Sequence, residues 1–191
     1  MDPDGAEFAD AIRPWIDGAR YLAEQGCRAI TTSCGFAAIF QRQLAETVAV
    51  PVFASSLLLA PLLVRMFRPG RRVGIIVADS ACLTPAHYAG AGIDPESVAV
   101  IGMDGCAEFA ATSWGDQPHL DVARLEAETI SVARQLVAAN PALGAILLEC
   151  SLLPPYAAAV QAATGLPVFD FTHLVAMVHA ACARQPFVGM L

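Results

Sequence analysis

The amino-acid sequence predicts an α/β protein made of two pseudo-symmetric lobes, each built on a parallel sheet. The first observation is an internal repeat, in which residues 29–53 match residues 145–169 without a gap at a constant separation of 116 residues. Matched identities include Cys34 with Cys150 and Phe53 with Phe169. The second observation is that each copy has the pattern strand, helix, strand, which is typical of parallel sheets. Duplicated sequence indicates duplicated structural units.

The elements of the first lobe follow from its apolar periodicity. A helix is expected over residues 13–25, with Pro14 in its first turn, because Ile16, Ala19 and Leu22 recur at helical spacing. A buried strand over 28–32, a helix over 37–47 and a strand over 50–54 follow. Arg68-Pro69-Gly70 indicates a lobe boundary. We therefore expect residues 1–69 to form the first lobe, which carries Cys34.

The second lobe, residues 70–170, is expected to be longer and to carry Cys150. Strands are predicted over 72–78 and 97–102, a helix over 122–139, and then a strand over 145–148, a helix over 155–163 and a strand over 166–169. Pro154 and Pro155 suit the first turn of a helix. Residues 171–191 are expected to form a C-terminal helix that packs back on the first lobe.

The first lobe has no counterpart of the strand over 72–78. A counterpart 116 residues earlier would lie before Met1, so the first lobe is expected to lack its N-terminal strand. The favoured interpretation is a truncated chain. The alternative is a naturally shortened lobe that is completed by dimerisation, and a homodimer is one of the expected states because an incomplete lobe exposes apolar surface.

Composition excludes several classes of protein. The chain of 191 residues is 56% hydrophobic and 15% charged, which indicates a folded protein. A net charge of −7 without a basic run argues against nucleic acid as a partner. The apolar stretch over 48–64 contains Pro51 and Pro61, so no membrane span is expected, and the polar, acidic start suggests no signal peptide and a cytoplasmic location. None of the six cysteines forms a CxxC or zinc pattern, so free thiols and no metal are expected.

Cys34 and Cys150 are the candidate catalytic residues. Each follows the end of a predicted strand, where parallel sheets bind ligands, and each precedes a helix. Two facing lobes would bring the thiols to opposite sides of one ligand, so that one thiol removes an α-proton and the other returns a proton. The helix N-terminus is expected to lower the thiol pKa from about 8.5. The alternative is that both are core residues kept from a duplicated ancestor.

Other candidate substrate-binding residues surround the same strand ends. Gly35 would let the backbone approach a ligand closely, and the remaining candidates offer polar groups: Thr32, Ser33, Ser56, Asp79, Ser151 and His173. Helix capping is the competing interpretation for Ser56 and His173, and it is the favoured one for Asp170. Glu149 is interpreted either as a structural carboxylate or as a group that tunes Cys150, and His87 is expected at the surface.

TTSCGF over Thr31–Phe36 and LLECSLLPPYAAAV over Leu147–Val160 resemble the two cysteine motifs of the aspartate/glutamate racemase superfamily. That group includes hydantoin racemase, maleate isomerase and arylmalonate decarboxylase. The resemblance covers essentially the whole chain. It implies two Rossmann-like lobes with the active site between them, catalysis by Cys34 and Cys150, and no cofactor, including no pyridoxal phosphate.

Two departures from the family motifs affect the expected substrate. Ser33 stands where many members have Asn, and Glu149-Cys150-Ser151-Leu152 stands where Gly-Cys-Thr-Glu is common. The favoured function is a racemase- or epimerase-type isomerase that acts on a small carboxylate, either an amino acid or a related compound. The alternatives are an enzyme like arylmalonate decarboxylase or maleate isomerase that uses the same cysteines, or an inactive truncated paralogue.

Overall fold

The computed structural model describes residues 6–115, 119–186 and 188–189. It is an α/β structure with two parallel sheets. The first sheet pairs β1 (Ile30–Thr31) with β2 (Val52–Phe53). The second has the order β4-β3-β5-β6 and contains β3 (Arg72–Val77), β4 (Val98–Gly102), β5 (Leu143–Leu148) and β6 (Val168–Phe169). The predicted α/β class with parallel sheets is confirmed.

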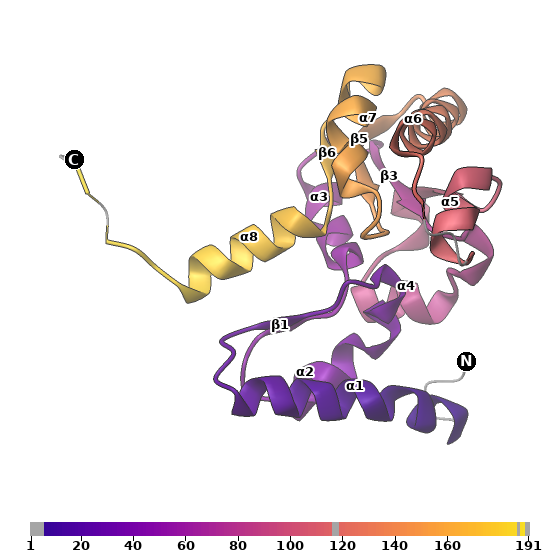
Figure 1. Ribbon diagram of the computed structural model, residues 1–191. Helices are drawn as coiled ribbons and strands as arrows, with labels where there is room; N and C mark the ends of the chain where they lie inside the picture. Colours follow the sequence, from indigo (N-terminus) through magenta and orange to yellow (C-terminus); the bar gives the residue numbers. More distant parts are fainter. Residues whose placement is uncertain (1–5, 116–118, 187, 190–191) are drawn as a thin grey trace.

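Helices surround these sheets (Figure 1). The α-helices are α1 (Ala6–Glu24), α2 (Gln41–Thr47), α3 (Ala60–Arg65), α4 (Pro85–Ala91), α5 (Ala107–Ser113), α6 (Val122–Ala139), α7 (Ala157–Thr164) and α8 (Phe171–Cys182). Short 3-10 helices are η1 (Gly35–Phe40), η2 (Ser56–Leu59), η3 (Ser80–Cys82), η4 (Pro95–Ser97) and η5 (Pro154–Tyr156). No described helix is both long and apolar enough to cross a membrane.

The repeat in sequence is also a repeat in register. Ile30 pairs with Val52 in the first sheet, and Ile146, 116 residues later, pairs with Val168 in the second. Each pair is followed by a second in-register pair, which ends in Phe53 in one sheet and in Phe169 in the other. The matched segments therefore form the same parallel strand pair in both sheets.

The prediction for Pro14 is wrong. Helix α1 begins at Ala6, so Pro14 lies inside the helix and not in its first turn. Phe8 and Ile12 are buried in an apolar cluster that includes Phe40, and this packing extends the helix toward the N-terminus. Tertiary burial here outweighs the local cost of an internal proline.

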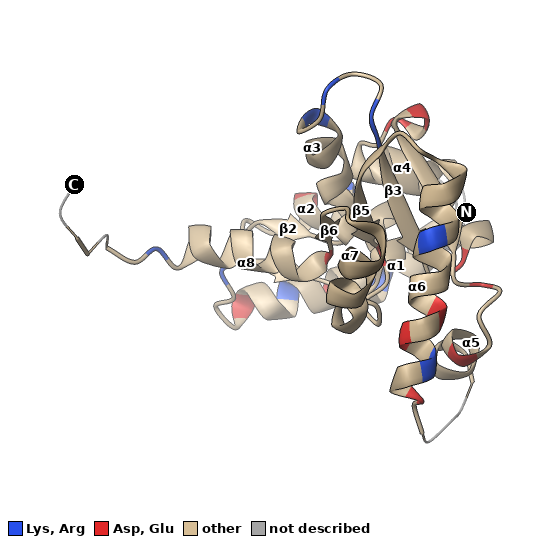
Figure 2. Cartoon of the chain, turned by 90° about the horizontal axis from the view of Figure 1, so that it is seen from above, with Lys and Arg blue, Asp and Glu red and all other residues tan. Residues whose placement is uncertain are grey.

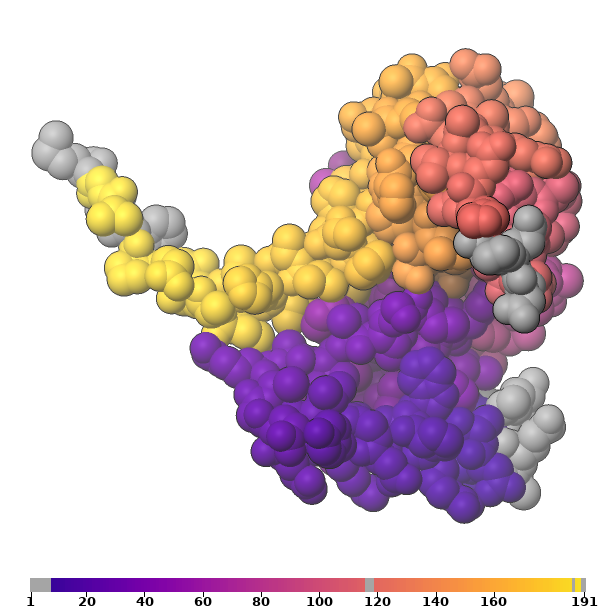
Figure 3. All heavy atoms as spheres, viewed as in Figure 1, coloured from indigo at the N-terminus to yellow at the C-terminus, as the bar shows by residue number. Residues whose placement is uncertain are grey.

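The space-filling view shows the N-terminal part of the chain packed against the part that contains the second sheet and its helices (Figure 3). Helix α8 leads away from both (Figures 1 and 3). Its Leu174 is buried in a cluster that also contains residues of β3 and α3, and the Cys182 thiol lies 3.5 Å from the carbonyl of Arg28. The division at residues 69 and 170 remains a prediction.

Candidate active site

The structure places the two candidate thiols at equivalent strand ends. Cys34 follows β1 and is the N-cap of η1, with extended backbone angles, and Cys150 follows β5 after one intervening residue. Cys34 is exposed and Cys150 is half-buried. Cys150 and Phe36, which lies two residues after Cys34, pack against the same apolar cluster, so the two thiol-bearing segments lie near each other. That both thiols act in one site remains a prediction.

Glu149 lies against both thiol-bearing segments. Its side chain is buried, and Oε2 accepts a hydrogen bond from the Ala78 N–H at 3.0 Å, at the end of β3. A Cβ on Gly35 would overlap the Glu149 carboxyl group. The space that a side chain at position 35 would need is therefore filled by a carboxyl group. This close contact explains why a glycine stands here, and it could not be predicted from the sequence.

Burial dominates the titration of this site. It raises the pKa of Glu149 to about 7, while the Ala78 N–H acts in the opposite direction. It also raises the pKa of Cys150 to about 11 and that of Cys34 above its ordinary value, and the charge of Glu149 adds to both shifts. The backbone N–H groups of Phe36 and Ala37 do lower the pKa of Cys34. Desolvation outweighs them, so the predicted lowering of the thiol pKa values is wrong.

Two hydroxyl groups predicted to bind substrate instead hold the backbone near the thiols. Ser56 Oγ donates to the Glu149 carbonyl at 3.1 Å, which ties η2 to the end of β5. Thr32 Oγ1 donates to the Ala54 carbonyl at 2.6 Å and accepts from the Cys34 N–H at 3.2 Å. Both residues therefore position the thiol segments, and direct contact with a substrate remains a prediction for them.

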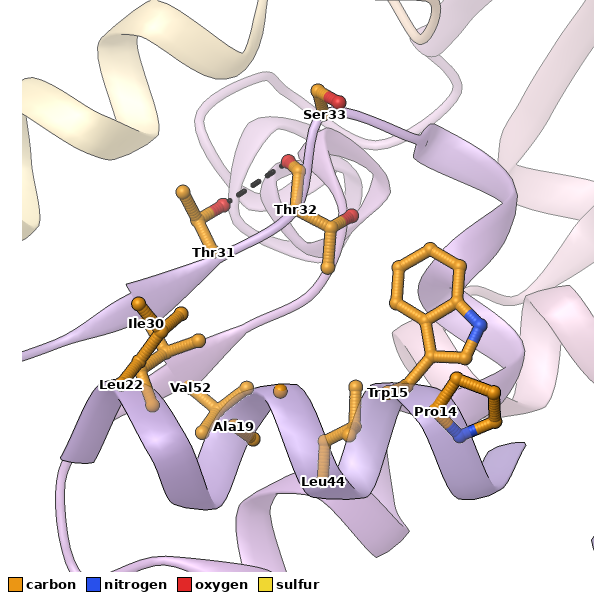
Figure 4. Close-up of a pocket in the computed structure, with 11 residues that line it drawn as sticks. Pro14, Trp15, Ala19, Leu22, Ile30, Thr31, Thr32, Ser33, Leu44 and Val52 are labelled. Carbon is orange, nitrogen blue, oxygen red and sulfur yellow. Dashed lines mark hydrogen bonds between the residues drawn. The ribbon is translucent and has the colours of Figure 1, made fainter. Parts of the chain in front are cut away.

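The other predicted binding residues lie at helix starts, directly after Cys150, or in a cavity beside α1. Asp79 Oδ1 accepts from the Ala81 N–H at 2.8 Å and caps η3. His173 forms a capping box with Asp170 at the start of α8, as capping chemistry predicts for Asp170. Ser151 is half-buried directly after Cys150. Ser33, with Thr32, lines a cavity of about 410 Å³ between α1 and β1 (Figure 4).

A smaller, aromatic pocket opens on Cys34. It has a volume of about 240 Å³ and is lined by Trp15, Cys34, Phe36, Ala37, Ile39, Phe40, Thr84 and His87. Sequence analysis missed it and wrongly placed His87 at the surface, whereas only 8% of this residue is exposed. The reason is close packing of α4 on η1, where a Cβ on Gly90 would overlap the carbonyl oxygen of Ala38. Thr84 and His87 form a capping box at the start of α4, and their spacing was the signal in the sequence that a helix begins here.

Among the described residues, no group of three or more His, Cys, Asp or Glu side chains is arranged to hold a metal ion. No protein-family model matches the chain.

Curated relatives include dimethylsulfoniopropionate lyase 3 of Emiliania huxleyi (strain CCMP1516), 35% identical over 95% of this chain and 49% of the relative. Lyase 7 of the same strain is 38% identical over 96% and 56%. A dimethylsulfoniopropionate lyase of Durusdinium sp. clade D is 34% identical over 85% and 53%.

The chain thus spans about half the length of these curated relatives. Solved structures with a similar fold include arylmalonate decarboxylase, with a TM-score of 0.62 and 18% identity over 96% of this chain and 79% of that chain. Allantoin racemase from Pseudomonas fluorescens gives 0.57 and 16% over 85% and 70%. A glutamate racemase isoform from Bacillus anthracis gives 0.58 and 13% over 95% and 68%.

The chain has the fold of the aspartate/glutamate/hydantoin racemase superfamily. The resemblance of its two cysteine motifs predicted this fold, and the prediction is confirmed. In this racemase-superfamily fold the carboxyl ends of β1 and β5 carry Cys34 and the Glu149-Cys150 pair. The two motifs include Glu149 and Phe36 but did not predict their contacts with Gly35 and His87, because those contacts join distant segments.

Proposed function

We propose that this chain supplies the active site of a cofactor-independent lyase that removes an α-proton from a small carboxylate and expels a group from the β-carbon. The observation that carries the proposal is the meeting of Cys34, Cys150 and the Glu149 carboxyl group at the carboxyl ends of β1 and β5. The curated relatives named dimethylsulfoniopropionate lyases support elimination as the reaction and a zwitterionic β-sulfonio carboxylate as the substrate.

The reaction needs one base. The thiolate takes the α-proton, the electrons of the C–H bond form the double bond, and the bond between the β-carbon and sulfur breaks. Dimethyl sulfide leaves as a neutral molecule with the bonding electron pair, acrylate remains, and the thiol later releases its proton to solvent. Both thiol pKa values are raised in the free protein, which favours the protonated thiols. The positive charge of a bound substrate would lower the pKa of a nearby thiol and so favour the thiolate when the substrate is in place.

We assign the role of base to Cys34, because it is the more exposed thiol and lines the aromatic pocket. Cys150, whose pKa is about 11, stays protonated and can donate a hydrogen bond to the carboxylate as enolate-like charge develops there. The neighbouring Glu149 would oppose a second negative charge at this point, and this favours a protonated Cys150.

A second candidate is a racemase or epimerase of the same fold. It is favoured by the origin of the thiols, which come from equivalent strand ends of the two sheets. In that reaction one thiol would remove the α-proton and the other would return a proton to the opposite face. The substrate would then keep its β-substituent.

The deciding experiment incubates the protein with dimethylsulfoniopropionate in D₂O and follows dimethyl sulfide by gas chromatography and acrylate by NMR. Aspartate, glutamate and hydantoins are screened in parallel for α-proton exchange. The proposal expects acrylate and dimethyl sulfide in equal amounts, with loss of both in Cys34→Ala and no loss in the control Cys182→Ala, whose thiol lies at the end of α8. Exchange without elimination would select the racemase, and neither reaction would reject both functions.

A further inference from the structure

The pocket beside Cys34 has walls of aromatic rings. Phe36 meets His87 edge-on at a centroid distance of 5.4 Å, and Trp15 packs against Phe40 at 5.6 Å. Trp15 projects from α1 and also borders the larger cavity, where Figure 4 shows its ring beside Pro14. With a volume of about 240 Å³, the pocket is smaller than the usual site of a drug-sized ligand and matches a compact group of a few heavy atoms.

The pocket is free of positive charge. None of its described lining residues is Arg or Lys. Arginines near the second sheet lie in the loop between α3 and β3 and on α6 (Figure 2). Burial lowers the pKa of His87, and its Nδ1 accepts a hydrogen bond from the Thr84 N–H at 3.1 Å, so the ring is neutral at neutral pH. Nothing in the lining therefore repels a cation.

An acidic side chain lies close to the pocket, next to the residue that follows Cys34. Gly35, which separates Cys34 from Phe36 in the chain, packs against the Glu149 carboxyl group. The faces of aromatic rings attract cations, and methylated onium groups are bound in this way by aromatic cages. A neutral alkyl group would gain only the apolar contact.

We propose that this pocket binds the methylated onium end of the substrate and so selects a carboxylate with an onium end over one with an uncharged alkyl end of the same shape. The inference rests on the proposed function for the identity of the group as a dimethylsulfonio cation. It goes beyond that function because it assigns the specificity to named residues: Trp15, Phe36 and Phe40, with His87 kept neutral beside them.

The test compares two unreactive probes of equal shape by isothermal titration calorimetry. The cationic probe, with a trimethylammonio end, is the zwitterion 3-(trimethylammonio)propionate, and its isostere with an uncharged tert-butyl end is 4,4-dimethylpentanoate. We expect the cation to bind about tenfold more tightly, since a desolvated cation–ring contact has roughly this strength. Trp15→Leu and Phe36→Leu should each remove most of the difference, whereas Trp15→Phe should keep much of it. Trp114→Leu is the matched control, because the only other tryptophan lies on Phe109.

Equal binding of both probes, or no binding of either, overturns the proposal. Equal weakening of both probes in Trp15→Leu and Phe36→Leu also overturns it, because that result indicates a purely structural role. The outcome is separable from the proposed function. Preferential binding of the cation without elimination would retain the onium pocket and reject the lyase, and elimination that is inhibited equally by both probes would do the reverse.

Discussion

The two strand–helix–strand units share sequence and register but differ in how many neighbours support them. Ile146 of β5 pairs with Gly74 on one side and with Val168 on the other, whereas Ile30 of β1 pairs with Val52 alone among the described residues. All six residues of β5 are buried. In the first unit, α1 and β1 instead border a cavity of about 410 Å³.

This difference teaches that the repeat sets where each thiol lies but not how firmly it is held. Cys150 follows a strand that is central in a four-stranded sheet. Cys34 follows a two-residue strand and is held by contacts such as the hydrogen bond from its N–H to the Thr32 hydroxyl. Cys150, the thiol that follows the better-supported strand, is also the more deeply buried one. The two thiols therefore differ both in the packing that holds them and in their exposure to a ligand.

Removal of each thiol should have the largest effect and tests whether Cys34 and Cys150 have different roles. Cys34→Ala should lower the rate of elimination about 10³-fold, because the base is lost. Cys150→Ala should lower it about 10²-fold, because a donor to the developing charge is lost. Steady-state release of dimethyl sulfide measures both, with thermal unfolding to verify folding. Equal losses would instead fit a symmetric two-base mechanism.

Truncation of the matched isoleucines tests the difference in support directly. Ile146→Ala should reduce the free energy of unfolding by about 4 kcal/mol, because it leaves a void in a closed core. Ile30→Ala should cost about 2 kcal/mol, since its surroundings include a cavity and can collapse more easily. Urea unfolding measures both values. A cost for Ile30→Ala as large as that for Ile146→Ala would show that the first sheet is as tightly packed as the second.

Glu149 connects the two units, and its titration makes stability depend on pH. Its pKa is raised to about 7, above the ordinary value of 4.5, so the folded state favours the protonated form. This contribution is fully present below pH 4.5 and is lost as the pH rises through 7, on the order of 3 kcal/mol in all. Glu149→Gln should remove that part of the pH dependence. An unchanged slope in urea titrations between pH 4.5 and 7 would contradict the assignment.

Long, periodic elements could be predicted from the sequence, and short ones were overestimated. The helix predicted over 122–139 matches α6, and the strand predicted over 72–78 matches β3 within one residue. The strand predicted over 28–32 is only Ile30–Thr31, because a strand extends only as far as a neighbour pairs with it. Local pattern therefore predicts a strand's place better than its length.

The thiols could be found from sequence because they repeat, and Glu149 was considered as a group that tunes Cys150, but the long-range contacts around the thiols could not be predicted. Glu149 acquires its importance from Gly35, which is distant in the chain and has no side chain to signal the contact. His87 is buried because α4 packs on η1 through Gly90, another contact without a side-chain pattern. The direction of the thiol pKa shifts was missed for the same reason, since desolvation depends on the folded packing.

The smallest expected effect is that of a substitution in α1, which tests how well the first unit is packed. Gly18 lies within α1 and borders the larger cavity, and a Cβ added there would meet nothing within 4 Å. Gly18→Ala should therefore raise the free energy of unfolding by about 0.5–1 kcal/mol without loss of activity, because alanine favours the helix and adds no clash. Gly92→Ala is the matched control, because its φ of +68° should make the same substitution destabilising. If Gly18→Ala is destabilising, another group must already pack against α1 at this point. The first unit would then be better supported than its two strands suggest.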